Sequence, residues 1–258
     1  MTLPLPDILA VICGSAVGFS LALIGGGGSI LAMPLLLYVV GVRDPHIAIG
    51  TSALAVAVNA FANIIPHAHA GHVHWKPAFA FATAGVVGAF LGSSLGKVVN
   101  GQHLLVLFAL QMLVVAALMI RGRREEGDSR YPLPHMLPRL GAIGLGAGGL
   151  SGFFGIGGGF LIVPGLMLGS GMPIINAIGT SLFSVGAFGL TTAINYAASS
   201  LVDWRVAAEF IAGGLVGGWL GAMGAGRLAR KRGVLNVVFA CVIVLVAIFM
   251  LVKSLHSW

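Results

Sequence analysis

Charged residues are scarce in this sequence, and that scarcity excludes a soluble fold. Only 8% of the 258 residues are Asp, Glu, Lys or Arg, and 58% are hydrophobic. Soluble domains carry about 25% charged residues. The mean hydropathy is +1.02, and the apolar residues form runs along almost the whole chain, which a single anchor helix does not explain. The sequence therefore predicts a polypeptide that is embedded in a lipid bilayer throughout.

Cysteines and catalytic motifs are also few. Cys13 and Cys241 stand far apart in apolar runs, so the sequence indicates neither a disulfide framework nor a metal knuckle. It contains no nucleophile elbow, phosphate-binding loop or paired-carboxylate motif. The formal net charge of +7 comes from basic residues in short loops, where positive charge sets membrane topology. We expect no enzyme, no cofactor, no resident metal and no nucleic-acid partner.

Glycine is abundant, with 40 residues, and small residues let transmembrane helices pack closely or break. The apolar runs fall into two series of five, separated by a polar stretch. The expected elements are residues 8–24, 29–42, 47–65, 77–99 and 104–120, then 140–154, 160–172, 174–198, 206–228 and 234–252. We interpret residues 1–121 as a first membrane repeat, 122–137 as a cytoplasmic linker and 138–258 as a second membrane repeat.

The two series share residues in the same order, which indicates an internal duplication. At an offset of 129, residues 48–52 (Ala-Ile-Gly-Thr-Ser) match residues 177–181, and Trp75 matches Trp204. At an offset of 130, glycines, a leucine and a proline between residues 25 and 34 recur between 155 and 164. Chance similarity between glycine-rich segments does not explain the Thr-Ser, Trp and Pro matches.

Basic residues predict that the two halves have opposite orientations. Arg residues in the central linker and the basic cluster at 227–232 place both segments in the cytoplasm, whereas the first-half loop near Lys97 and His103 is far less basic. The first half is therefore expected to be upside down, with its N-terminus outside. The predicted fold is an all-α polytopic membrane protein with two inverted-topology repeats. It has eight to ten hydrophobic helical elements, among them Gly-broken helical hairpins, and such repeats place a binding site near the midplane.

The glycine-rich segments at residues 25–29 and 155–159 are the strongest candidates for a binding site. Each joins one apolar run to the next. Consecutive glycines break a helix and free backbone N–H groups, which a membrane tolerates only where protein or a cavity satisfies them. The start of the next helix then offers N–H donors and a partial positive charge that suit an anion. Close helix packing is the alternative explanation for these glycines.

The Gly-Thr-Ser segments at residues 50–52 and 179–181 are a second candidate. Asp44 and Pro173 precede expected helix starts, so the hydroxyls lie about 10 Å along each helix. Neutral hydroxyls can donate to an oxyanion, although bonding to the preceding helical turn is an alternative. The candidate substrate-binding residues are Gly26, Gly27, Gly28, Ser29, Thr51, Ser52, Gly157, Gly158, Gly159, Thr180 and Ser181. Further candidates for a polar lining are Asn59, Asn63, Thr191, Thr192 and Asn195.

No Lys or Arg falls in the middle of an apolar element, so an anion site has to be built from dipoles and hydroxyls. Four histidines, His67, His69, His72 and His74, form a cluster in the loop expected before Trp75. Alternating histidines can bind a transition metal, which leaves a metal-ion permease as an alternative function. A membrane scaffold without transport activity is a third reading.

Two motifs resemble the TauE/SafE family of sulfite and organosulfonate exporters. One is Ala-x-Gly-Thr-Ser, present twice, and the other is Gly-Gly-Gly followed by Pro, after five residues in the first half and four in the second. The resemblance covers nearly the whole chain. It implies a multi-pass transporter of the bacterial inner membrane for small sulfur-containing anions such as sulfite, thiosulfate or sulfoacetate. The expected partners are such an anion and the bilayer, transport is expected to be export by alternating access, and a homodimer is left open.

Carried onto this sequence, the Gly-rich segments of the family are residues 26–28 and 157–159, and its Gly-Thr-Ser segments are residues 50–52 and 179–181. The first half departs from the family pattern, because it reads Ile-Gly-Gly-Gly-Gly at residues 24–28 where the family favours Gly-x-Gly-Gly-Gly. The histidine cluster is not part of the family pattern.

Overall fold

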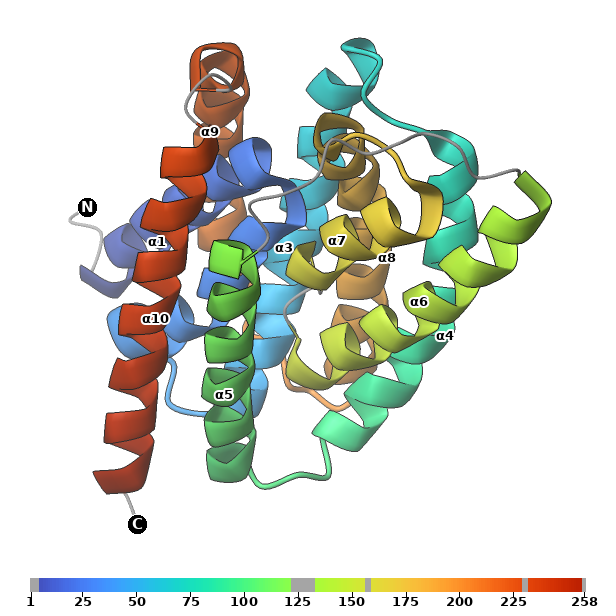
Figure 1. Ribbon diagram of the computed structural model, residues 1–258. Coiled ribbons are helices and arrows are strands. Elements are labelled where there is room, and N and C mark those ends of the chain that lie inside the picture. The colour runs from blue at the N-terminus through green and yellow to red at the C-terminus, as the bar shows by residue number, and fades with distance from the viewer. Residues whose placement is uncertain (1–4, 122–132, 156–158, 229–231, 257–258) are drawn as a thin grey trace.

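The computed structural model describes residues 5–121, 133–155, 159–228 and 232–256, and every regular element in these ranges is a helix (Figure 1). The elements are α1 (Leu5–Ile24), the 3₁₀ helix η1 (Gly25–Leu31), α2 (Ala32–Leu35), the π-helix η2 (Leu36–Val40), α3 (Pro45–His69), α4 (Trp75–Gly96), α5 (Gly101–Arg121), α6 (Leu133–Phe154), α7 (Gly159–Ser170), α8 (Ile174–Ala197), α9 (Trp204–Leu228) and α10 (Arg232–His256).

Five of the described segments are long and apolar enough to cross a membrane. They are Leu5–Val40, Pro45–His69, Trp75–Gly96, Ile174–Ala197 and Trp204–Met223. The expected all-α polytopic membrane protein is thereby confirmed. α6 begins at Leu133, so residues 133–137 of the expected linker are helical.

Two of the long helices begin at capping aspartates, of which Asp44 is the one that the sequence predicted. The Asp44 carboxylate accepts a hydrogen bond from His46 N at 2.7 Å, and Pro45 follows as the first residue of α3. Asp203 caps α9 in the same way, because its carboxylate accepts from the backbone N–H groups of Arg205 and Val206, both at 3.1 Å. An aspartate at this position satisfies N–H groups that the first helical turn leaves unpaired.

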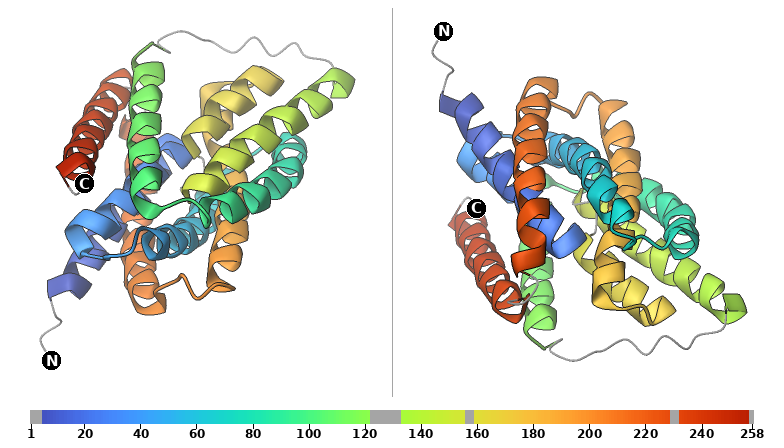
Figure 2. Two further views of the ribbon diagram at one scale, coloured as in Figure 1. Left: turned by 90° about the horizontal axis from the view of Figure 1, so that it is seen from below. Right: turned by 90° about the horizontal axis from the view of Figure 1, so that it is seen from above.

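α3 and α8 form the centre of the bundle. In their apolar windows 67% and 72% of the residues are buried, against 39% to 44% in the windows that include α1, α4 and α9. α1 packs along α9, and α4 packs along α6. Figure 2 shows these two pairs on either side of α3 and α8, while α5 and α10 lie next to each other at the edge of the molecule.

Contacts recur in matched pairs at positions that differ by 129. Asn59 of α3 lies against Gly214 of α9, and Phe188 of α8 lies against Gly85 of α4. Gly50 approaches the Leu201 carbonyl. Its equivalent, Gly179, approaches the carbonyl of His72, which is the equivalent of Leu201. These equivalent positions in the two halves therefore have matching neighbours.

Glycines set the distance between the paired helices, and two neighbours in α6 allow a direct test. An added Cβ on Gly148 would lie 2.0 Å from the Gly85 carbonyl oxygen of α4, whereas one on Gly146 would have nothing within 4 Å. We expect Gly148→Ala to lower the free energy of unfolding by about 1–3 kcal/mol, because the helices must separate. Gly146→Ala should raise it by up to about 1 kcal/mol through helix propensity. Titration of the purified protein with SDS measures both, and equal effects would contradict the packing.

Candidate functional site

Both helix interruptions occur at glycines of the predicted segments. α1 ends at Ile24, and Gly25 has φ of +69°. α6 ends at Phe154, and Gly155 has φ of +68°. Only glycine adopts this backbone conformation without a steric penalty. After its break the chain folds back, since η2 packs against α1. The predicted Gly-broken hairpin is thus present in the first half.

The two interruptions touch each other. An added Cβ on Gly26 would lie 2.1 Å from the Gly159 Cα, and one on Gly159 would lie 2.0 Å from backbone atoms of Gly26. These distances mean that the two backbones are in contact without any side chain between them. Around them, Gly25 faces Ile178 of α8, and Gly155 faces Ile49 of α3. The breaks of the two halves therefore meet beside the two central helices.

The predicted serines lie at this meeting point and are fully buried. The Ser181 hydroxyl donates to the Ile178 carbonyl at 2.7 Å and accepts from Gly26 N at 3.5 Å. In the other half, the Ser52 hydroxyl donates to the Ile49 carbonyl at 3.0 Å. Ser29 closes the first break, because its hydroxyl donates to the Gly26 carbonyl at 2.7 Å. Ser181 thus joins α8 to the glycine break of the opposite half.

The two predicted threonines hold the connections that precede α4 and α9. Thr51 Oγ1 accepts from Asp203 N at 2.9 Å, and Thr180 Oγ1 accepts from His74 N at 3.0 Å. The glycine before each threonine leaves room for the same connection. Gly50 lies against the Leu201 carbonyl before α9, and Gly179 lies against the His72 carbonyl before α4. Each threonine hydroxyl therefore fixes a turn of the opposite half, a role that the sequence did not reveal.

The other predicted site residues have different surroundings. Gly28 packs against the backbone of Ser20 and Leu21 in α1, so it supports the hairpin. Gly27 is less crowded, because an added Cβ there would meet only Ile24. Gly157 and Gly158 lie outside the described residues.

The histidine cluster is not arranged for metal binding. Its predicted position in a loop is wrong for two members, because α3 continues through Pro66 and holds His67 and His69 in its last turn. Pro66 lies inside α3, where it removes only one backbone donor, so the helix extends beyond the expected end at residue 65. Within the described ranges, no group of three His, Cys, Asp or Glu side chains is placed to hold a metal ion. His67 Nε2 lies 3.2 Å from the Ala22 carbonyl oxygen instead.

Comparison with known proteins agrees with the motifs and the helical architecture. The family model described as "Sulfite exporter TauE/SafE" matches residues 10–250. The chain belongs to the TauE/SafE family. This TauE/SafE chain is 53% identical to a "Probable membrane transporter protein" of Xylella fastidiosa (strain Temecula1). The 252 aligned residues cover 97% of each chain. The protein is therefore a membrane transporter and not an enzyme.

More distant relatives of the TauE/SafE chain have similar names. The "Probable membrane transporter protein YunE" of Bacillus subtilis is 27% identical over 263 residues, which cover 93% of this chain and 95% of the relative. A probable membrane transporter protein of Methanocaldococcus jannaschii is 30% identical over 192 residues, which cover 71% of this chain and 68% of the relative. No solved structure matches the chain.

Two polar clusters of this TauE/SafE protein were not predicted. At the C-terminal ends of α4 and α8, Lys97 Nζ donates to Asn195 Oδ1 at 2.8 Å and to Ser199 Oγ at 3.0 Å. At the start of α9, Arg205 bridges the carboxylates of Asp7 and Glu209. The ion pair with Arg205 accounts for Glu209, an acid within the apolar element expected at residues 206–228. Arg205 and Glu209 are four residues apart on α9, but Lys97 with Asn195 and Arg205 with Asp7 join segments that are distant in sequence, so no local pattern indicates those contacts.

Proposed function

We propose that this TauE/SafE transporter carries a small sulfur-containing anion, such as sulfite, thiosulfate or an organosulfonate like sulfoacetate, across the bacterial inner membrane. The anion is bound where the glycine breaks of the two halves meet. One observation supports this most strongly, namely the contact between the Gly26 and Gly159 backbones beside Ser181. Because neither glycine has a side chain, the two interruptions converge on one point, and donors from both halves can face one solute beside it.

The buried polar groups of the described residues suit an anion that sheds its water. Hydroxyl and amide side chains predominate among them, beside Asp7 and His67, and no Lys or Arg of the described residues is buried. Neutral donors bind an oxyanion and still release it, since they bring no fixed counter-charge that would hold it. Sulfite and sulfonates present three oxygens that can accept hydrogen bonds from donors on several sides. The binding set predicted from the sequence is Gly26, Gly27, Gly28, Ser29, Thr51, Ser52, Gly157, Gly158, Gly159, Thr180 and Ser181, of which Thr51 and Thr180 act by holding the connections before α4 and α9.

In this proposal the halves are inverted repeats that move against each other. Residues 1–121 form the first membrane repeat, 122–137 a cytoplasmic linker, and 138–258 the second membrane repeat. The recurring contacts at an offset of 129 support the duplication, and the basic loops support the inversion. Rocking of one repeat against the other exposes the central site alternately to each side and exports the anion.

Transport of labelled sulfite and sulfoacetate into or out of proteoliposomes tests the function. We expect the double variant Ser52→Ala with Ser181→Ala to lose at least about tenfold in flux, because one lost hydrogen bond to a charged ligand is worth about 1.5–3 kcal/mol. Thr83→Ala is the matched control, since Thr83 is an exposed hydroxyl that also bonds to its own helix. Wild-type flux in the serine double variant would remove these hydroxyls from the mechanism.

Two details of the proposal need separate measurements. Proteoliposomes with the protein in a known orientation report the direction of transport. Crosslinking of the purified protein reports whether it forms the homodimer that the sequence leaves open. Thermal stabilisation by divalent transition metals would favour the alternative metal permease, for which the described residues offer no ligand group.

A further inference from the structure

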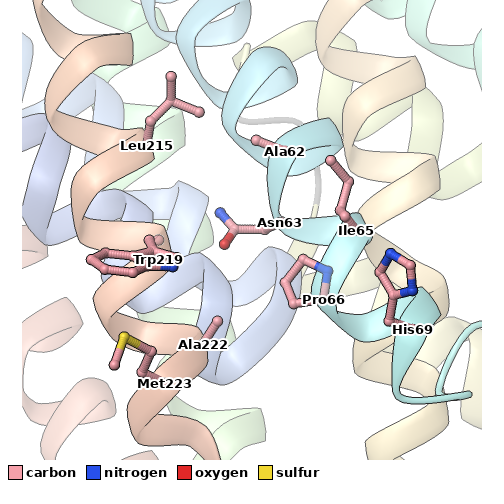
Figure 3. Close-up of a pocket in the computed structure, with 10 residues that line it drawn as sticks. Ala62, Asn63, Ile65, Pro66, His69, Leu215, Trp219, Ala222 and Met223 are labelled. Carbon is pink, nitrogen blue, oxygen red and sulfur yellow. The ribbon is translucent and has the colours of Figure 1, made fainter.

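A pocket of about 560 Å³ lies between the last turns of α3 and the second half of α9 (Figure 3). Its volume falls in the range of small-molecule sites, about 300–1,000 Å³. Most of its lining is apolar, and Trp219 forms one wall. Asn63 extends from α3 toward α9 inside the pocket, and His69 stands at the end of α3 (Figure 3). The pocket is therefore an apolar hollow with an amide group in its interior.

The equivalent interface in the other half, between α8 and α4, is closed by hydrogen bonds. Asn195 Nδ2 donates to Ser93 Oγ at 2.7 Å and to Ser94 Oγ at 3.0 Å. Lys97 Nζ donates in turn to the Asn195 side chain and to its carbonyl oxygen, at 2.8 and 3.1 Å. This network, which we call the α4–α8 latch, holds the two helices together at one end of the bundle.

The sequence explains why the α3–α9 interface lacks such a latch. At an offset of 129, Pro66 occupies the position of Asn195, while Ala222 and Met223 occupy those of Ser93 and Ser94. None of these three side chains can donate or accept a conventional hydrogen bond. All three line the pocket. The duplicated interface has therefore diverged into one closed and one open form.

Two amides continue from the pocket into the protein. Asn63 is 4% exposed, and its Nδ2 donates to the Asn59 carbonyl one turn deeper at 2.9 Å. Asn59 is fully buried, and neither its amide nitrogen nor its amide oxygen has a hydrogen-bond partner in the structure. A buried amide without a partner costs about 1–3 kcal/mol. Such a group is expected where a ligand or water passes and supplies the missing bond.

We propose that the α3–α9 pocket is the entrance through which the anion reaches the protein interior, and that Asn63 and Asn59 are its successive amide ligands. The amide nitrogens donate to the oxygens of a sulfite or sulfonate group. The apolar walls accommodate the short organic part of an organosulfonate. The α4–α8 latch keeps the equivalent route at the other end closed. The inference rests on the proposed function, since it names the route by which that anion travels.

A cysteine-reactive sulfonate tests the entrance. The reagent 2-sulfonatoethyl methanethiosulfonate is itself a small organosulfonate, and it is applied to protein in which Cys13 and Cys241 are replaced by Ala. Ala62→Cys places the thiol in the pocket, and Thr191→Cys places it at the equivalent position beside the latch. We expect Ala62→Cys to react at least about tenfold faster. Sulfoacetate, which unlike sulfite does not react with the reagent, should at about ten times its half-saturating concentration slow that reaction about tenfold by competition.

The outcomes separate the entrance from the transport function. Equal reaction of the two thiols, or no protection by sulfoacetate while the cysteine-free protein still transports sulfoacetate, would overturn the entrance and leave the transport function intact. Absence of sulfite and sulfonate flux in that protein would overturn the transport function and with it the entrance.

A second variant does not depend on thiol chemistry. Asn63→Asp is nearly isosteric and places a negative charge on the route, so sulfite flux should fall at least about tenfold through repulsion. Unchanged flux would contradict the role of Asn63.

Discussion

Gly26→Ala is expected to abolish transport and to prevent formation of the native bundle. The new methyl group would lie 2.1 Å from the Gly159 Cα and 2.6 Å from a methyl group of Val185. The first of these neighbours is backbone, so no rotamer change relieves the overlap. The two halves would have to separate at their central contact. We expect a loss of more than about 4 kcal/mol in the free energy of unfolding, measured by SDS titration, and no sulfite flux in proteoliposomes.

The adjacent glycine provides the control. An added Cβ on Gly27 would meet only Ile24 side-chain atoms, the nearest at 3.0 Å. A small adjustment of that side chain accommodates the methyl group. Gly27→Ala should therefore keep most of the stability and a measurable flux, although both residues belong to one run of glycines. Equal damage from the two substitutions would show that the glycines act through backbone freedom and not through the contact between the halves.

The sequence predicted the features that depend on local pattern and on duplication. Glycine runs inside apolar segments indicated interrupted helices, and Gly25 and Gly155 have the left-handed backbone that such interruptions need. Matching residues in the two halves indicated equivalent positions, and contacts such as Asn59 with Gly214 and Phe188 with Gly85 recur accordingly. These features follow from residue type and order alone.

The features that the sequence missed depend on contacts between the halves. Thr51 is 152 residues from Asp203, whose N–H it accepts. Nothing in a run of apolar residues indicates which turn of the opposite half lies above that hydroxyl. The α4–α8 latch was missed for the same reason, since Lys97 and Asn195 meet only after α4 packs on α8. Helical phase alone does not decide whether a buried hydroxyl faces a solute or a backbone N–H.

Replacing both Thr51 and Thr180 by Val tests whether these two hydroxyls face the anion or a backbone N–H. Valine keeps the shape but removes the oxygen that accepts from Asp203 N and His74 N. Leaving a buried donor unpaired costs about 1–3 kcal/mol at each site. Because the two sites hold different connections, their effects should add, giving about 2–6 kcal/mol in SDS titration. Sulfite flux should fall together with stability, since α4 and α9 lose their anchored starts.

The corresponding Thr51→Ser with Thr180→Ser variant keeps both hydroxyls. It should retain most of the stability and flux, because serine offers the same acceptor with one methyl group less. A different result would reassign the threonines. If the valine variant loses flux while its free energy of unfolding stays unchanged, the hydroxyls act on the anion itself. The turns before α4 and α9 would then be held by their remaining contacts, and the threonines would join Ser52 and Ser181 as direct ligands.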